Sequence, residues 1–420
     1  MKLNVFKFFN TFKFEELLLI FFPLLIISGP FFSDLSVVFF SIFCLFYIIK
    51  KKIKNLVLFN YKFIFIFWFF CFFSTIINYS FDSISLKLTL KSIALLRFYL
   101  FICFIIFLIE CNKSILKHIF NIVFFILIFL SVDSYLQLIF KFNLFGYEKI
   151  DPKRLSGIFN DEYILGSILF KISILMLYTS KFSKINENYI LLFFLIIIEP
   201  LIFFSGQRGP FLISVILIMG MFFINYKNKY FYISLIYLIL LIGGNLIFNK
   251  KYNERFIFDI KENLKYDNVI DLKNNEQKKL NYSILTPSHT QLYASSLQMF
   301  YEKKLFGHGT NSFRHKCKDY NKCSTHPHNF YLQMLAEGGL TCFLFLFGFF
   351  CYILIDYLKC LNSILIRKKK NLSASYYLIL GILLIFFPLQ PNGNFFNNYM
   401  LVQISFLVAI YLHERKETTS

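Results

Sequence analysis

The stretch YILLFFLIIIEPLIFFSGQRGPFLISVILIMGMFFI, residues 189–224, decides the fold. It contains two apolar runs, 189–204 and 209–224, which are separated only by the polar tetrapeptide SGQR. A surface helix of a soluble protein keeps a polar face, whereas these runs are apolar all round. A helix needs roughly 20 apolar residues to cross a bilayer, so the stretch predicts two neighbouring membrane spans joined by a tight turn.

The same pattern recurs along the whole chain of 420 residues. Hydrophobic residues account for 57% of it and charged residues for 16%, whereas a soluble protein carries about 25% charged residues. We therefore predict an all-α polytopic membrane protein with about 12 transmembrane helices and one large, partly helical periplasmic loop. The expected spans are residues 16–31, 34–49, 61–78, 88–109, 115–140, 162–180, 189–205, 209–226, 230–248, 329–357, 374–390 and 397–413.

The distribution of basic residues orients these spans. The formal net charge of +20 would suggest a nucleic-acid partner in a soluble protein, but here the basic residues cluster in every second short loop. Representatives of these loops are Lys50, Lys113, Lys181, Lys227 and Arg367. Because cytoplasmic loops carry the excess of lysine and arginine, we expect these loops and both termini in the cytoplasm, and no nucleic-acid partner.

This topology divides the chain into three parts. Spans one to nine occupy residues 1–248, the large periplasmic loop occupies 249–328, and spans ten to twelve with a cytoplasmic tail occupy 329–420. Apolar residues at helical spacing in the loop, including Leu292 and Met299, predict a helix that packs against the rest of the protein. A large, asymmetric outer loop favours an enzyme over a transporter built from inverted repeats.

Four polar segments fall on the periplasmic side of this topology. The first, residues 205–210, turns at two glycines and leads into a span, which holds Arg208 beside a helix N-terminus. Free N–H groups, the helix dipole and a guanidinium together can form a phosphate site. The alternative is that Arg208 is an interfacial anchor whose guanidinium reaches the lipid headgroups.

The second segment, residues 326–332, begins a span and contains His326 and His328. A histidine with a pKa near 6.5 at the boundary of water and membrane can accept a proton from a hydroxyl. One alternative is a surface histidine at a helix start. Another is a zinc site in which both histidines join Cys317 and Cys323. In an oxidising compartment, a disulfide between these two cysteines is favoured.

The remaining polar positions are weaker as motifs. Residues 305–314 contain two glycines and end in Arg314, and they fit a turn better than a phosphate loop because no strand–helix context supports a nucleotide fold. Residues 153–162 bring Arg154 to the entry of a span. Arg97 differs because it lies within an expected span, where a charge is costly and usually faces a cavity or a partner.

Together these segments resemble the O-antigen ligase/polymerase family of bacterial membrane glycosyltransferases. The resemblance rests on the order and spacing of RLSGIFN (154–160), SGQRG (205–209), LFGHG (305–309), HNFYL (328–332) and EGG (337–339). It implies a donor glycan linked to undecaprenyl diphosphate and a glycan or glycolipid acceptor, in addition to the membrane lipids. It also implies transfer at the periplasmic face of the inner membrane without a cofactor, a nucleotide sugar or a metal.

The resemblance further implies roles for individual residues. Arg208 and Arg314 would bind the diphosphate, and His328 would act as the general base on the acceptor hydroxyl. We expect Arg208 and His328 to approach each other across one cavity. Supporting positions would be Arg97, Arg154, Gln207, His326 and Asn329.

Within this family we expect a ligase, which joins the glycan to lipid A–core. A polymerase, which joins it to another lipid-linked repeat, is the first alternative, and a polysaccharide transporter or flippase is a more distant one. A transporter would need internal repeats and charges along the middle of its spans, and of such charges we identify Arg97.

Overall fold

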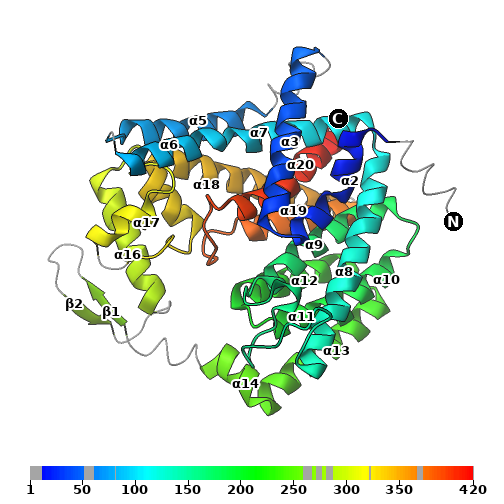
Figure 1. Cartoon of the computed structure of the whole chain (residues 1–420). Helices are drawn as coiled ribbons and strands as arrows, with labels where there is room; N and C mark the ends of the chain where they lie inside the picture. Colours follow the sequence, from blue (N-terminus) through cyan, green and yellow to red (C-terminus); the bar gives the residue numbers. More distant parts are fainter. Residues whose placement is uncertain are drawn as a thin grey trace.

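The computed structural model describes residues 12–51, 61–80, 82–258, 267–270, 277–280, 287–320, 323–366 and 372–419. Within these residues the chain is almost entirely helical (Figure 1). The exception among them is a pair of antiparallel strands in the long loop, β1 (Asp267–Ile270) and β2 (Gln277–Leu280). The prediction of a helical protein is therefore confirmed apart from this hairpin.

Each expected span coincides with one or more helices. In chain order these are α2 (Phe14–Ile27), α3 (Pro30–Ile49), α5 (Lys62–Ile77), α6 (Ser83–Ala94) with α7 (Leu96–Cys111), α8 (Ser114–Phe140), α9 (Leu165–Thr179), α10 (Glu187–Phe193) with the π-helix η3 (Phe194–Ile198) and α11 (Glu199–Phe204), α12 (Arg208–Asn225), α13 (Lys229–Phe248), α18 (Phe330–Leu365), α19 (Ser373–Ile385) and α20 (Asn398–Thr419). The shorter elements are η1 (Gly157–Phe159), η2 (Ser180–Phe182), α14 (Lys250–Asn253), η4 (Glu254–Phe258), α16 (Pro287–Glu302), α17 (Phe313–Lys316) and η5 (Cys317–Asp319).

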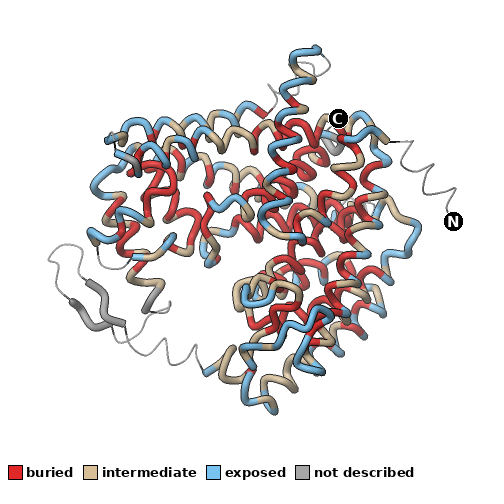
Figure 2. The backbone as a smooth tube through the Cα atoms, viewed as in Figure 1, coloured by how far each residue is buried: buried red, intermediate tan, exposed pale blue. Residues whose placement is uncertain are grey.

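Eight membrane-spanning candidates among the described residues are long and apolar enough to cross a bilayer, and α5 and α19 are shorter apolar helices. These findings support a multi-pass membrane protein. The count of about 12 crossings stays a prediction. The apolar surface of α13 fits a lipid environment, because Ile233 and Leu240 are 60% and 71% exposed. In contrast, the centre of the bundle is buried (Figure 2), where α20 packs on α7 and α19 packs on α9 and α18.

The span expected at residues 88–109 lies within one candidate membrane span, Ile84–Cys111. It consists of α6 and α7, which meet at Leu95, a residue with helical backbone angles (φ −63°, ψ −22°). Arg97 lies close to this junction, in the first turn of α7. Its guanidinium forms an ion pair with Asp34 at 2.7 Å, so the expected partner of this charge is found.

Helix α18 is also longer and less regular than the expected span at residues 329–357. Its 36 residues correspond to roughly 54 Å, which exceeds the roughly 30 Å hydrocarbon core of a bilayer. The backbone leaves the helical region at Gly339, where φ is 66° and ψ is −164°. The first turns of α18, before this break, therefore belong to the folded loop region.

The turns between helices collect at two ends of the bundle. At one end, which we call the lysine end, Lys181 forms an ion pair with Glu414 at 2.6 Å, and Ser373 donates to Glu187 at 2.9 Å. This end includes the turns at Lys50, Lys113 and Lys227. The expected basic loop at Arg367 lies outside the described residues. The assignment of this end to the cytoplasm stays a prediction.

The opposite end, which we call the motif end, holds the turns around residues 141–164, 205–208, 303–329 and 386–397. The side-chain amide of Gln207 donates to the carbonyl of Tyr163, which joins the first two of these turns. The N–H of Asn392 donates to the carbonyl of His328 at 2.8 Å, which joins the last two. All four sequence segments singled out above therefore meet at one end of the protein.

The long loop packs on this end through α16. Leu292 and Met299 are buried together with Phe313, Cys317 and Ala336 in a small apolar cluster beside α18. This confirms the prediction that the apolar helical pattern in the loop buries against the rest of the protein.

Candidate functional site

A polar cavity of about 700 Å³ lies at the motif end. Its lining comes from α6, α7, α9, α20 and the loop between α16 and α18, so segments far apart in the sequence share one space. The charged side chains in the lining are Lys91, Arg97, Glu162, Lys171, Arg314 and the ionisable His326. The ion pair with Asp34 neutralises the charge of Arg97. The remaining cations are Lys91, Lys171 and Arg314, and the one carboxylate in the lining is that of Glu162. The positive charges outnumber the negative one, so the cavity favours an anionic ligand.

Arg314 is held at this cavity by the buried carboxylate of Glu337. Glu337 accepts the backbone N–H groups of Asn311 and Phe313 at 2.9 and 2.8 Å, and so fixes the chain immediately before Arg314. Within the described residues, Arg314 Nε is buried and has no hydrogen-bond partner. A guanidinium that is positioned in this way can donate to an anion that enters the cavity.

A cluster of three histidine rings lies at the start of α18. The ring centroids of His326 and His328 are 4.1 Å apart, and those of His328 and His289 are 5.3 Å apart. Burial, with a smaller effect from the neighbouring His328 and Arg314, lowers the pKa of His326 to about 4. Burial also lowers the pKa of His328. Both imidazoles are therefore neutral near pH 7 and able to accept a proton.

The backbone of this histidine segment is fixed by the loop between α19 and α20. His328 adopts a φ of 60°, which is unusual for a residue with a side chain and persists only where the surroundings hold it. Asn329 caps α18, because its Oδ1 accepts the N–H groups of Tyr331 and Leu332 at 2.9 and 3.0 Å. Its Nδ2 donates to the carbonyl of Pro388 at 2.7 Å. Asn329 therefore positions the histidines and does not line the cavity.

The glycine segments at 305–309 and 337–339 form a docking contact between two backbones. The N–H groups of His308 and Gly309 donate to the carbonyls of Ala336 and Glu337 at 3.1 and 2.8 Å. A Cβ atom on Gly339 would lie 2.5 Å from the backbone of Leu305. The expectation of a turn rather than a phosphate loop at 305–314 agrees with this contact.

The turn that carries Arg208 is held by two sets of hydrogen bonds. Gln207 joins it to the entry of α9, since its side chain accepts from Ser167 N–H and donates to the carbonyl of Tyr163. Arg208 Nε and Nη2 donate to the carbonyl of Arg255 at 3.0 and 2.7 Å. Arg255 Nε in turn donates to the carbonyl of Gly206 at 2.9 Å.

Arg154 completes a group of three arginines beside this turn. Its guanidinium lies 4.0 Å from the centre of the Tyr163 ring. Burial lowers its pKa, and Arg255 and Arg208 add to the effect through their positive charges. The structure therefore brings Arg154, Arg208 and Arg255 together. Neither Arg208 nor His328 is among the residues that line the polar cavity, which instead presents Arg314 and His326.

Lys171 is a cavity residue that the sequence analysis missed. It lies in the second turn of α9, on one wall of the cavity. Lys171 could have been recognised from the sequence, because it lies in the middle of the apolar run at residues 162–180. A lysine within a span is as unusual as Arg97 within its own span.

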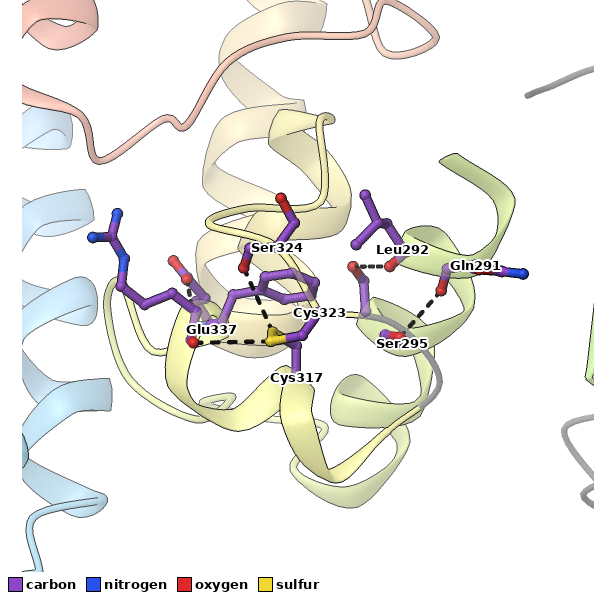
Figure 3. Close-up of a disulfide and its surroundings, with 10 residues drawn as sticks. Gln291, Leu292, Ser295, Cys317, Cys323, Ser324 and Glu337 are labelled. Atoms are coloured by element: carbon purple, nitrogen blue, oxygen red, sulfur yellow. Dashed lines mark hydrogen bonds between the residues drawn. A yellow bond between two sulfur atoms is a disulfide. The ribbon is translucent and has the colours of Figure 1, made fainter. Parts of the chain in front are cut away.

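Cys317 and Cys323 form a disulfide, as an oxidising compartment would favour. Figure 3 shows the disulfide between α16, which carries Leu292 and Ser295, and Glu337 of α18. The bond removes both thiolates that the zinc alternative requires. In the part of the chain that the structure describes, no group of three His, Cys, Asp or Glu residues could hold a metal ion.

These features define a multi-pass helical membrane protein with a cationic cavity beneath a folded loop at one end. Residues 191–347 match the family described as O-Antigen ligase, so the resemblance is confirmed over this segment. The family implies an enzyme of the O-antigen ligase or polymerase type, which acts on lipid-linked glycans and glycolipid acceptors. No curated protein matches the chain.

Proposed function

We propose that the chain is an O-antigen ligase-like glycosyltransferase. It moves a glycan from undecaprenyl diphosphate to a sugar hydroxyl of lipid A–core at the periplasmic face of the inner membrane. The observation that supports this best is the polar cavity, which combines Arg314, Lys91 and the neutral ring of His326 in one space. A lipid diphosphate needs cations for the charge that develops as it leaves, and an acceptor hydroxyl needs a base.

In the proposed reaction, the acceptor oxygen attacks the anomeric carbon of the donor sugar. The bond from that carbon to the diphosphate oxygen breaks, and the diphosphate keeps the electron pair. The acceptor proton passes to the imidazole of His326, whose Nε2 is buried without a hydrogen-bond partner among the described residues. Donor binding favours this step, because a nearby diphosphate raises the affinity of the imidazole for a proton. The transfer uses no nucleotide sugar and no metal.

We assign the proton-accepting role to His326 because its side chain lines the cavity. His328, the first choice from the sequence, becomes a positioning residue whose ring packs on that of His326. Arg314 and Lys91 bind the diphosphate. Arg208 and Arg154 form a second cationic group, outside the lining of the polar cavity. Arg208 binds a phosphate oxygen when it releases its hydrogen bonds to the carbonyl of Arg255.

The test is glycan transfer in membranes that carry single variants at matched protein levels. We expect His326→Ala to lower kcat by about 10²–10⁴-fold with donor binding largely intact. We expect Arg314→Ala to lower kcat by roughly 10²–10³-fold and to weaken donor binding as well. His328→Ala should be impaired, and His328→Phe should restore most of the activity because it keeps a ring against His326.

His315→Ala is the matched control, because His315 follows Arg314 directly but is exposed. Near-normal transfer by His326→Ala would remove this residue from the mechanism. Full activity of Arg208→Ala, with Arg208→Lys equally active, would reduce that arginine to an interfacial anchor. Two acceptors, lipid A–core and a second lipid-linked glycan, separate ligase from polymerase by the product that forms.

A further inference from the structure

Lys171 is a buried cation for which the proposed reaction has no role. It lies on α9, and only 9% of its surface is exposed. It lies about 9 Å along the helix axis from Leu165, the first residue of α9. A charge in a membrane-spanning helix is expensive and is usually balanced by a partner or used by a ligand.

The partners of Lys171 are all neutral. Its Nζ donates to Ser167 Oγ at 3.1 Å, to Gln403 Oε1 at 2.9 Å and to Met400 Sδ at 3.3 Å. Among the described residues Lys171 forms no ion pair. A thioether sulfur is a weak acceptor, so the N–H that faces Met400 is the one that a ligand oxygen would take.

The wall around Lys171 differs from the wall around Arg314. Lys171 and its neighbours belong to α9 and α20, whereas Arg314 and His326 belong to the loop between α16 and α18. The α9–α20 wall presents neutral amide and hydroxyl groups, from Ser167, Asn397, Asn398 and Gln403. Side chains of this kind hydrogen-bond to sugar hydroxyls, whereas a single ammonium among them is suited to a carboxylate.

We propose that Lys171 binds a carboxylate on the glycan, so that the enzyme acts on an acidic glycan that contains a hexuronate or a similar sugar acid. This proposal rests on the proposed function, in which the diphosphate occupies the Arg314 wall. The carboxylate replaces the weak contact with Met400 and supplies the negative charge that the buried ammonium lacks.

Two synthetic donors test this inference. Both are polyprenyl diphosphate disaccharides, and they differ only at C6 of one hexose, which is a hydroxymethyl group in one and a carboxylate in the other. Polyprenyl diphosphate without sugar is the third probe. Binding to the detergent-solubilised full chain is measured by the ligand-dependent rise in unfolding temperature over a concentration series.

We expect the wild type to bind the acidic donor about 10- to 100-fold more tightly than the neutral donor, as for one charge-assisted hydrogen bond. Lys171→Gln should abolish this preference, because it weakens binding of the acidic donor much more than binding of the neutral donor. Lys171→Arg should keep part of the preference. Gln403→Glu places a carboxylate beside the ammonium and should abolish the preference while the lysine remains in place. Lys227→Gln, at an exposed lysine of the opposite end, is the matched control.

If Lys171→Gln loses the same amount of affinity for both donors, the inference is overturned and Lys171 is assigned to binding the diphosphate. Unchanged binding of both donors would also overturn it, and would leave Lys171 as a structural residue. If the wild type binds none of the three probes, the proposed function itself fails, which is a distinct result.

Discussion

The buried imidazole of His326 predicts how glycan transfer depends on pH. Because burial lowers its pKa to about 4, the ring is neutral at pH 8 and stays neutral as the pH falls to about 5. We expect kcat/KM for glycan transfer to be nearly flat over this range and to fall only as the pH approaches 4. The measurement is the pH profile of the detergent-solubilised enzyme. An inflection near 6.5 that disappears in His326→Ala would indicate an ordinary, solvated histidine and contradict the assignment.

The segments singled out in the sequence meet at one end of the protein, but the side chains that line its polar cavity differ from the pair that the sequence favoured. Arg314 and His326 line the cavity, although the sequence favoured Arg208 and His328 as the central pair. Which of two histidines in a His-Pro-His segment faces a cavity depends on the backbone angle at His328, and that angle is set by hydrogen bonds from residues about 60 positions away. A single sequence holds no signal for such a contact.

The non-helical backbone at Gly339, within α18, predicts how a substitution there changes stability and transfer. Gly339 has a φ of 66°, and an added Cβ would lie 2.5 Å from the backbone of Leu305. We expect Gly339→Ala to lower the free energy of unfolding by at least about 1–3 kcal/mol, from backbone strain alone. We also expect it to separate the loop at Gly307 from α18. Transfer should fall with it, because the same loop carries Arg314. Thermal unfolding and glycan transfer are the measurements.

Gly348→Ala is the control in the same helix, because a Cβ there meets no atom within 4 Å. It should be neutral or slightly stabilising, since alanine favours a helix. Equal stability of the two variants would show that the contact between Gly307 and Gly339 does not hold the loop.

Hydropathy alone located the helices, because the length and the apolar surface of a span are local properties. The non-helical backbone at Gly339 was not predicted, since it depends on what the neighbouring backbone contacts. The glycines involved were visible as EGG and LFGHG, but their pairing joins residues about 30 positions apart.

The two ends of the protein are expected to face opposite sides of the membrane. The structure places the polar motifs at one end and most of the short basic loops at the other, and the positive-inside rule assigns the lysine end to the cytoplasm. We expect a phosphatase reporter that works only in the periplasm to be active when fused after Asn275 and inactive when fused after Lys227 or Ser420. An active reporter at Ser420 would reverse the topology and place the cavity on the cytoplasmic face.

The ion pair between Asp34 and Arg97 has a consequence for biosynthesis. The two residues are 63 positions apart and belong to different hairpins of the chain. A lone charge at the centre of a newly inserted helix costs about 2.5–3.5 kcal/mol on translocon scales, but Asp34 and Arg97 lie near the helix starts, where a charge can reach the interface. Because α3 emerges from the ribosome well before α7, Asp34 cannot form this ion pair until α7 has been synthesised. The contact between the two helices is therefore completed only after both have been inserted.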